Sequence, residues 1–425
     1  MQILVLGSGA REHALVKALS ADPGVDAVVA APGNPGIGLI ARCEPLADLT
    51  DGAAVAALAT RLGVDLVVVG PEVPLVAGVA DVVRAAGIDC YGPSAAAAQL
   101  EGSKAFAKEV MSAADVPTAL AQVCTTVEQV EDAFDLLGSP YVVKDDGLAA
   151  GKGVVVTDDR DAALKHAWAC LDKPDGRVVI EAFLDGPEVS LFCVCDGWRA
   201  VALEPAQDFK RVGDDDAGPN TGGMGAYSPL PWAPEGLADD LVARVAQPVL
   251  DEMRSRGTPF VGTLFIGLAL TSRGPRVIEF NARFGDPETQ VVLARLLTPL
   301  GGLLLAAAQG RLEDVPRLRW SPQSAVTVVV AADNYPGTPR TGDPISGLAE
   351  VEEVDTAYVL HAGTALDGEG TLVSSGGRVL SVVALGDTLA QARNRAYAAV
   401  DLVDLPGSHH RTDIALKAAR GQITV

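Results

Sequence analysis

Short apolar runs alternate with amphipathic segments over the first hundred residues. The spacing of apolar positions predicts helices between buried strands, and these strands are expected at 2–6, 25–31, 66–69 and 88–91. The segment 52–62 is one such helix, because Thr50 and Asp51 can cap its start and Gly63 its end. This alternation predicts a doubly wound parallel sheet, whose ligands bind at the carboxyl ends of the strands.

Polar loops rich in turn-forming residues follow three of these strands, at 7–13, 32–36 and 70–74. The first loop resembles the dinucleotide fingerprint G-x-G-x-x-G, but Glu12 stands where the third glycine is needed. The end of the second strand also lacks the acidic residue that binds a ribose. The loop therefore predicts a phosphate cradle at a helix N-terminus, without a dinucleotide.

A second unit spans 118–187. Its helix, 127–137, begins with a capping box formed by Thr126 and Gln129 and ends at Gly138. The pattern further predicts a helix starting near Asp159 and strands at 141–144, 154–157 and 178–181. The Gly- and Ala-rich segment 145–153 joins two of these strands and favours a loop that closes over phosphates. An ordinary hairpin is the alternative, although the segment is long for one.

The segment 277–290 predicts a strand that enters a tight turn, V-I-E-F-N-A-R-F-G-D-P-E-T-Q. Alternation along a strand places Glu279, Asn281 and Arg283 on one face, with Ile278 and Phe280 on the other. A carboxylate, an amide oxygen and a guanidinium suit a site for Mg²⁺, polyphosphate and an anionic substrate. An edge strand with a surface ion pair fits the same residues equally well.

The polar segment 207–227 and the C-terminal hundred residues complete the chain. The segment 207–227 is rich in Gly and Asp, and a loop of this length is either disordered or functional. Lys210 and Arg211 close to Asp208 favour function. From 323 to 425, strands at 325–331 and 379–384 and a helix at 389–400 predict a small α+β domain.

Composition limits the classes of partner. The 425 residues are 48% hydrophobic and carry a net charge of −22, which disfavours nucleic acids and anionic membranes but allows small anionic ligands. Six cysteines without a C-x-x-C pair predict a reducing compartment, the cytoplasm. The chain starts with a strand rather than a signal segment, and no apolar run reaches the roughly 18 to 20 residues of a membrane span.

Five motifs together resemble the phosphoribosylamine–glycine ligase family of the ATP-grasp superfamily. They occur in one order along the chain, at 7–13 (GSGAREH), 101–104 (EGSK), 146–154 (DGLAAGKGV), 218–225 (GPNTGGMG) and 283–290 (RFGDPETQ). The last motif is highly specific, and the resemblance extends from residue 1 to about 420.

The resemblance implies an N-terminal substrate-binding domain, 1–100, and an ATP-grasp core, 101–117 with 188–322. It further implies an ATP-grasp lid, 118–187, and a C-terminal domain, 323–425. The expected reaction joins glycine to 5-phospho-β-D-ribosylamine, giving glycinamide ribonucleotide, ADP and phosphate through a glycyl phosphate. Only small-molecule partners and a monomer or weak homodimer are expected.

Residue roles follow from the resemblance at matching positions. ATP would be bound by Lys104, Lys144, Gly151, Lys152, Gly153, Glu181, Phe183, Leu184 and Glu188. Glu279 and Asn281 would hold Mg²⁺ or Mn²⁺. Asp208 and Arg283 would bind glycine, and both are counted with Lys144 as catalytic. Phosphoribosylamine would be bound by Gly9, Arg11, Asn34 and Glu72.

Some of these residues have a plainer interpretation. Taken singly, Lys104, Glu181 and Glu188 fit solvated surface charges, and only their joint occurrence with the other motifs favours binding roles. A different ATP-grasp ligase or carboxylase, or a nucleotide-binding module without activity, is the alternative function. Retention of Lys144 and of both metal ligands disfavours the inactive module.

The chain departs from the family pattern at four positions. Asp145 replaces a small residue, Phe209 replaces His, and Asp215 and Ala217 replace Lys and Thr. A negative charge at Asp145 is expected to weaken ATP binding modestly, unless its side chain faces solvent.

Overall fold

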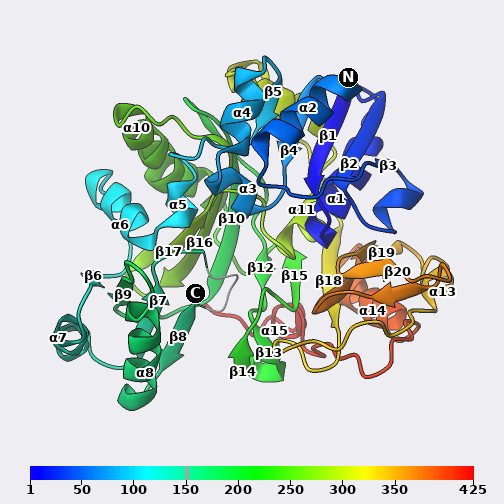
Figure 1. Ribbon diagram of the computed structural model, residues 1–425. Coiled ribbons are helices and arrows are strands. Elements are labelled where there is room, and N and C mark those ends of the chain that lie inside the picture. Colours follow the sequence, from blue (N-terminus) through cyan, green and yellow to red (C-terminus); the bar gives the residue numbers. More distant parts are fainter. Residues whose placement is uncertain (149–152) are drawn as a thin grey trace.

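The computed structural model describes residues 1–148 and 153–425 (Figure 1). Its N-terminal part is a parallel sheet of strand order β3-β2-β1-β4-β5, which confirms the predicted doubly wound fold. The strands are β1 (Gln2–Gly7), β2 (Ala27–Pro32), β3 (Arg42–Cys43), β4 (Leu66–Val69) and β5 (Asp89–Tyr91). The helices are α1 (Ala10–Ser20), α2 (Gly52–Leu62), α3 (Glu72–Val76) and α4 (Val79–Ala85). β3 was not predicted, because a two-residue strand carries no periodic signal.

The predicted start and end of α2 are confirmed. The Asp51 carboxylate accepts a hydrogen bond from the Ala54 amide at 3.0 Å, and Gly63 ends the helix in a left-handed conformation. The α2 helix contacts α4, so that Val55 and Ala59 reach the buried core.

The second unit is an antiparallel sheet of order β6-β9-β7-β8 with two helices. Its elements are β6 (Ala121–Cys124), α7 (Val127–Leu137), β7 (Tyr141–Asp145), β8 (Val154–Thr157), α8 (Arg160–Leu171) and β9 (Val178–Glu181). The predicted N-cap of α7 is confirmed, since the Thr126 hydroxyl accepts from the Gln129 amide. The capping box is not complete, because the Gln129 side chain accepts from the Thr125 amide instead of the Thr126 amide. The unit has its own hydrophobic cluster around Phe134 and Ile180, as expected of a body that can move separately.

The core is an antiparallel sheet of order β11-β10-β16-β17. Its strands are β10 (Glu188–Asp196), β11 (Ala200–Ala202), β16 (Val261–Thr271) and β17 (Gly274–Asn281). Its helices are α5 (Gln99–Gly102), α6 (Lys104–Ala113), α9 (Leu237–Leu241), α10 (Gln247–Ser255), α11 (Glu288–Arg295) and α12 (Leu300–Ala308). The buried face of β10, with Leu191, Cys193 and Cys195, belongs to the largest hydrophobic cluster, which extends into the N-terminal sheet.

A five-stranded sheet of order β12-β15-β18-β22-β19 joins the polar segment to the C-terminal hundred residues. Its strands are β12 (Gln207–Asp208), β15 (Gly225–Ser228), β18 (Ser324–Ala331), β19 (Ala357–His361) and β22 (Arg378–Gly386). The smaller elements are β13 (Arg211–Gly213), β14 (Ala217–Asn220), α13 (Leu348–Val351), β20 (Thr364–Leu366), β21 (Leu372–Ser374), α14 (Leu389–Val400) and α15 (Leu416–Ala419). The segment 207–227 is therefore ordered, with β13 and β14 as a hairpin.

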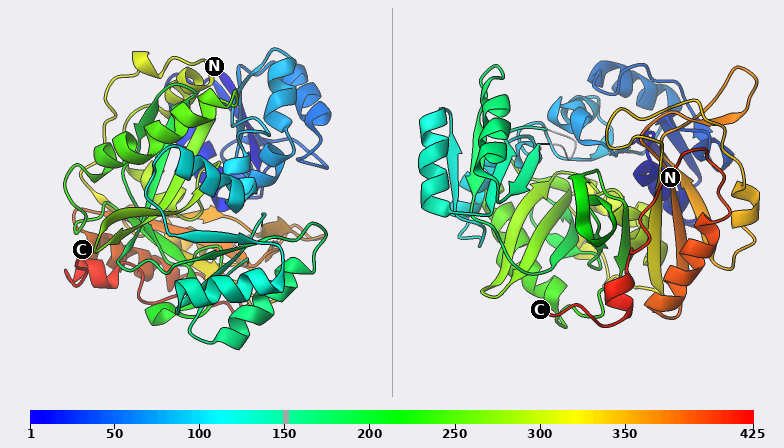
Figure 2. Two further views of the ribbon diagram at one scale, coloured as in Figure 1. Left: turned by 90° about the vertical axis from the view of Figure 1, so that its left-hand side faces the viewer. Right: turned by 90° about the horizontal axis from the view of Figure 1, so that it is seen from below.

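The four parts surround a common centre. Figure 2 shows the lid unit at one side of the core sheet and the C-terminal sheet at the other, with the N-terminal domain above both. Arg11, Pro71 and Glu72 follow the carboxyl ends of β1 and β4, and they border the same cleft as residues of the core sheet. Among the described residues, no helix is both long enough and apolar enough to cross a membrane.

We expect Gly186→Ala, at the junction of lid and core, to destabilise the protein strongly. Gly186 has a φ of +87°, and a Cβ there would lie 2.1 Å from the Leu270 carbonyl oxygen. Gly274 is a matched control, because its φ is +92° but a Cβ would meet no atom within 4 Å. Urea unfolding should show a loss of about 1–2 kcal/mol for Gly274→Ala from the backbone conformation alone. The loss for Gly186→Ala should be larger by at least about 1 kcal/mol, and equal losses would contradict the close approach.

Candidate active site

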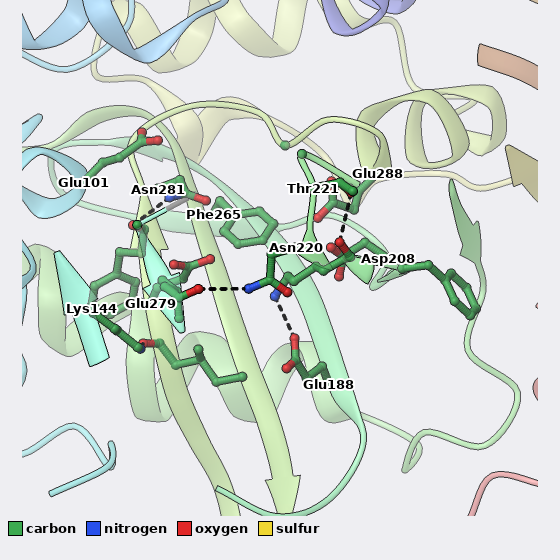
Figure 3. Close-up of a pocket in the computed structure, with 18 of the residues that line it drawn as sticks. Glu101, Lys144, Glu188, Asp208, Asn220, Thr221, Phe265, Glu279, Asn281 and Glu288 are labelled. Carbon is green, nitrogen blue, oxygen red and sulfur yellow. Dashed lines mark hydrogen bonds and ion pairs between the residues drawn. The ribbon is translucent and has the colours of Figure 1, made fainter. Parts of the chain in front are cut away.

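A cleft of about 770 Å³ lies where the lid, the core sheet, the polar segment and the N-terminal loops meet (Figure 3). Most of the residues selected from the sequence border it, namely Arg11, Glu72, Lys104, Lys144, Gly153, Glu181, Phe183, Leu184, Glu188, Asp208, Glu279, Asn281 and Arg283. Gly151 and Lys152 lie outside the described residues. Gly9 and Asn34 do not border the cleft.

A β-bulge in β17 determines which side chains face the cleft. Gly267 pairs with Glu279 and Leu268 with Val277, so Ile278 is the extra residue. Glu279, Asn281 and Arg283 border the cleft, and the buried Phe280 borders it as well. Ile278, expected on the face opposite to Glu279, also borders the cleft, because the bulge interrupts the strict alternation of side chains along β17.

The bulge also frees a backbone carbonyl for a lysine of the lid. The Lys144 ammonium donates to the Ile278 carbonyl oxygen at 2.9 Å and pairs with the Glu181 carboxylate at 2.9 Å. A second lysine pairs with Glu181, since the Lys108 Nζ lies 3.0 Å from the other carboxylate oxygen. Burial lowers the pKa of Lys108, although the Glu181 carboxylate acts in the opposite direction. Glu181 is 3% exposed, so the interpretation as a solvated surface charge is wrong for this residue.

The segment that follows β7 is docked on the start of α6. The Asp146 carboxylate accepts from the Ser103 hydroxyl at 3.0 Å and from the Ala105 amide at 3.1 Å, at the N-terminus of the helix. Lys104 donates to the Gly147 carbonyl oxygen at 3.0 Å. These bonds place the Lys104 ammonium beside the lid rather than in free solvent.

Asp145 lies on the face of β7 opposite to Lys144. Its carboxylate pairs with Lys173, and the residue does not border the cleft. The position of Asp145 therefore gives no reason to expect weaker ATP binding. Its side chain is nevertheless buried rather than exposed to solvent.

Glu279 and Asn281 fit a divalent cation. The Asn281 side-chain amide donates to the Phe280 carbonyl oxygen at 3.0 Å, which leaves its own oxygen for another partner. Burial disfavours the charge on Glu279, but Lys210 and Lys144 outweigh it and lower the pKa of this carboxyl. In the part of the chain that the structure describes, no group of three or more His, Cys, Asp or Glu side chains could hold a metal. A cation here would need oxygen ligands from a phosphate as well.

Arg283 is held by carboxylates from two domains. Its Nη2 lies 3.0 Å from Glu101 of α5, and its Nε lies 3.3 Å from Glu72 of the N-terminal domain. Glu101 also accepts from the Ala282 amide at 2.7 Å. Burial opposes the charge on Arg283, but these carboxylates outweigh it and raise the pKa of the guanidinium. The cation is thus fixed in orientation at the edge of the cleft.

The polar segment contributes a second charged group. Lys210 pairs with Glu188 at 2.6 Å, and Glu188 is exposed at the mouth of the cleft. Burial raises the pKa of the Asp208 carboxyl to about 7, and the charge of Glu288 adds to this while Lys210 opposes it. The carboxylates around Lys210 therefore exceed the local positive charge, which favours a cationic ligand group beside Asp208.

The polar segment departs from the family pattern at 209, 215 and 217. Contacts with C-terminal residues account for the first two of these positions. Phe209 lies under the Arg411 guanidinium, 4.9 Å from it, and Arg411 is itself 1% exposed. Asp215 pairs with Lys417 at 3.2 Å. Ala217 is exposed, and nothing in the structure explains its replacement of Thr.

The first N-terminal loop does not present the predicted empty phosphate cradle. The Glu12 carboxylate accepts from the Gly9 amide at 2.7 Å and from the Arg11 guanidinium at 2.5 Å, so the protein itself fills this helix start. The side chain of Asn34 is also hydrogen-bonded within the protein. Its Nδ2 donates to the Ser8 and His361 carbonyl oxygens, and its Oδ1 accepts from the Ile37 amide. Arg11 and Glu72 are the members of this predicted set that border the cleft.

Sequence reasoning gave no role to several residues of this site. Glu101 belongs to the motif at 101–104, but its partner Arg283 lies 182 positions later in the chain (from 101 to 283). No local sequence pattern can predict a contact between residues so far apart. Lys108 follows Lys104 by one helical turn, and that spacing alone could have indicated a shared face. Arg378 comes from the C-terminal sheet and bonds the Gly222 carbonyl oxygen at 2.6 Å and Asp286 at 3.0 Å.

Comparisons with known proteins cover nearly the whole chain. Models of phosphoribosylglycinamide synthetase match in three parts, the N domain at 1–101, the ATP-grasp (A) domain at 102–289 and the C domain at 325–417. A phosphoribosylamine–glycine ligase of Streptomyces coelicolor is 66% identical and covers 99% of this chain and 100% of its own. One of Mycobacterium tuberculosis is 56% identical, with 100% of both chains covered. The crystal structure of the Thermotoga maritima phosphoribosylamine–glycine ligase has a TM-score of 0.84 at 31% identity, covering 98% of this chain and 100% of the other.

We expect Lys108→Met to destabilise the protein, because Glu181 would lose one of its two cations in a buried position. Leaving a buried charge with fewer partners typically lowers the free energy of unfolding by about 1–3 kcal/mol. Lys165→Met is the matched control, since Lys165 is exposed on α8 and its loss should change stability by less than about 0.5 kcal/mol. Equal stability of the two variants in urea unfolding would show that Lys108 contributes nothing to the Glu181 network.

Proposed function

The chain belongs to the phosphoribosylglycinamide synthetase family, and we propose that it ligates glycine to 5-phospho-β-D-ribosylamine with ATP. The products are glycinamide ribonucleotide, ADP and phosphate, in purine biosynthesis. The observation that carries the proposal is the shared cleft, which Lys144 of the lid borders together with Glu279 and Arg283.

ATP would lie between the lid and the core sheet. Lys104 and Lys144 would contact its phosphates, since both border the cleft at the docked lid segment. Glu181, Phe183 and Leu184 connect the lid to the core and would contact the adenine. Glu188 would accept hydrogen bonds from the ribose hydroxyls. Gly151, Lys152 and Gly153 remain assigned to the phosphates on the sequence resemblance.

A divalent cation, Mg²⁺ or Mn²⁺, would be held by the Glu279 carboxylate and the Asn281 side-chain oxygen. When bound it would neutralise charge on the phosphate oxygens of ATP, which lowers their repulsion of the carboxylate that attacks the γ-phosphorus. The free oxygen of Asn281 and the ionised state favoured for Glu279 support this assignment.

Glycine would lie with its carboxylate at Arg283. Glu101 and Glu72 fix the guanidinium from behind, so its remaining donors are already directed when the substrate arrives. Asp208 would accept from the glycine ammonium. Phosphoribosylamine would approach from the N-terminal domain, where Arg11 and Glu72 border the cleft and Gly9 and Asn34 shape the loops behind them.

The reaction proceeds in two displacements. A glycine carboxylate oxygen attacks the γ-phosphorus of ATP, the bond to the β-phosphate oxygen breaks, and ADP leaves. The ribosylamine nitrogen then attacks the carbonyl carbon of the glycyl phosphate, and phosphate leaves with its bonding electrons while the nitrogen loses a proton. Lys144 and Arg283 hold the reacting groups in line, and the lid excludes water from the acyl phosphate.

Three broader expectations accompany this function. Small-molecule substrates account for the cleft without a nucleic acid or a membrane. A cytoplasmic location fits the reducing environment inferred from the cysteines. A monomer or weak homodimer remains the prediction for the assembly state.

The reaction is tested by ADP release from the purified protein. We expect release that requires glycine, phosphoribosylamine and Mg²⁺ together, because phosphoryl transfer needs the acceptor carboxylate in place. ADP release that ignores glycine and depends on bicarbonate or D-alanine would indicate a different ATP-grasp enzyme. Absence of any ATP-dependent reaction would favour a module that only binds nucleotides.

The metal assignment is tested by Glu279→Ala. Turnover should fall by about 100-fold or more, because charge neutralisation by a metal is worth several kcal/mol in the transition state. Thermal unfolding should stay close to that of wild type, since Glu279 faces the cleft rather than the core. Glu313→Ala, which removes an exposed partner of Arg199, is the control and should retain full activity. Wild-type turnover in Glu279→Ala would remove the metal from this position.

A further inference from the structure

Glu288 is a charged residue of the cleft that has no part in the function described above. It is the first residue of α11, directly after the Gly285-Asp286-Pro287 turn, and its side chain borders the cleft. It is only 3% exposed. A carboxylate that is buried to this extent normally has a cation or several donors as partners.

The protein supplies only some of the hydrogen bonds that the Glu288 carboxylate can accept. The Ser190 hydroxyl donates to Oε1 at 3.0 Å. No hydrogen bond to Oε2 from another side chain is found within the described residues. The chain approaches Oε2 closely at Gly285, where a Cβ would lie 2.7 Å from this oxygen. The turn thus holds the carboxylate close to the chain, with the Ser190 hydroxyl and the Glu288 backbone N–H as its donors. Among the described residues, no Lys, Arg or His forms an ion pair with it.

The charges around Glu288 are complementary to a zwitterion. Arg283 lies five positions earlier, in the segment between β17 and α11, and each of the two residues affects the pKa of the other. Asp208 is a second carboxylate in the same part of the cleft, and the Glu288 charge contributes to its raised pKa. Figure 3 shows Glu288 and Asp208 in the same part of the cleft, which Arg283 also borders. A small molecule with its carboxylate at Arg283 could therefore present an ammonium to these two carboxylates.

We propose that Glu288 and Asp208 together form the ammonium subsite of the acceptor, so that Glu288 selects a zwitterionic amino acid over a neutral-headed acid. This inference rests on the proposed function, because it assigns a contact to the glycine of that reaction. An ammonium carries three donors, and two carboxylates can accept more of them than Asp208 alone. Ser190 acts as a positioning residue through its bond to Glu288.

Glu288→Gln is the direct test, because glutamine keeps the shape and can still accept from Ser190 but carries no charge. We expect the KM for glycine to rise on the order of 10- to 100-fold, the loss typical of a hydrogen bond to a charged group. The KM for ATP should stay within about threefold of wild type. The ratio of kcat/KM for glycine to that for glycolate should fall by a similar factor, since glycolate has a hydroxyl in place of the ammonium.

Two further variants separate binding from structure. Glu204→Gln neutralises a half-buried carboxylate that pairs with Arg295 outside the cleft, and it should leave both KM values unchanged. Ser190→Ala removes the bond to Glu288 but keeps its charge, and it should raise the glycine KM much less than Glu288→Gln does. If Glu288→Gln does not fold, Glu288→Asp keeps the charge and should show an intermediate rise in glycine KM with partial retention of the glycine preference.

The outcomes distinguish this inference from the proposed function. An unchanged glycine KM and an unchanged glycolate ratio in Glu288→Gln, with wild-type turnover intact, would overturn the subsite alone. A Ser190→Ala variant that reproduces the full effect would assign Glu288 a structural role instead. A wild-type protein that does not use glycine would overturn the proposed function.

Discussion

The arrangement of this protein depends on a problem of like charges. The chain carries a net charge of −22, and its reaction brings a polyphosphate and a carboxylate into contact. Two anions in a partly buried cleft repel each other strongly unless cations lie between them. The cleft brings these cations together, with Lys104 and Lys144 at the lid, Lys210 in the polar segment and Arg283 two residues after the end of β17. These cations come from distant parts of the chain, and the cleft sets them among an equal number of acidic side chains, nine of each charge among its lining residues.

The same cations are immobilised by carboxylates behind them. Glu181 holds Lys144, Glu188 holds Lys210, and Glu101 with Glu72 holds Arg283. Because Glu72 comes from the N-terminal domain, the orientation of Arg283 depends on how that domain sits against the core. Arg378 plays a comparable part from the C-terminal sheet, where it bonds Asp286 next to the Glu288 turn. The site therefore requires all four parts of the chain to be assembled.

Local patterns were sufficient for most of the elements. Capping at Asp51 and Thr126 and the apolar runs of β1 and β4 were read correctly, because these signals lie within a few residues of one another. The bulge at Ile278 could not be read, because it depends on the register of β17 against β16. The Glu101 contact and the filling of the first loop by Glu12 were also missed, since both depend on tertiary neighbours. The family motifs gave the reaction, whereas the pairing of each cation with its carboxylate required the fold.

The central claim is that the cleft holds the glycine carboxylate against the terminal phosphate of ATP. Turnover of glycine labelled with ¹⁸O in both carboxylate oxygens tests this directly, with mass spectrometry of the released phosphate. A glycyl phosphate requires one carboxylate oxygen to leave with the phosphorus. The account predicts that each phosphate released carries one ¹⁸O atom from glycine. Phosphate without label, released in step with the ligation product, would contradict it.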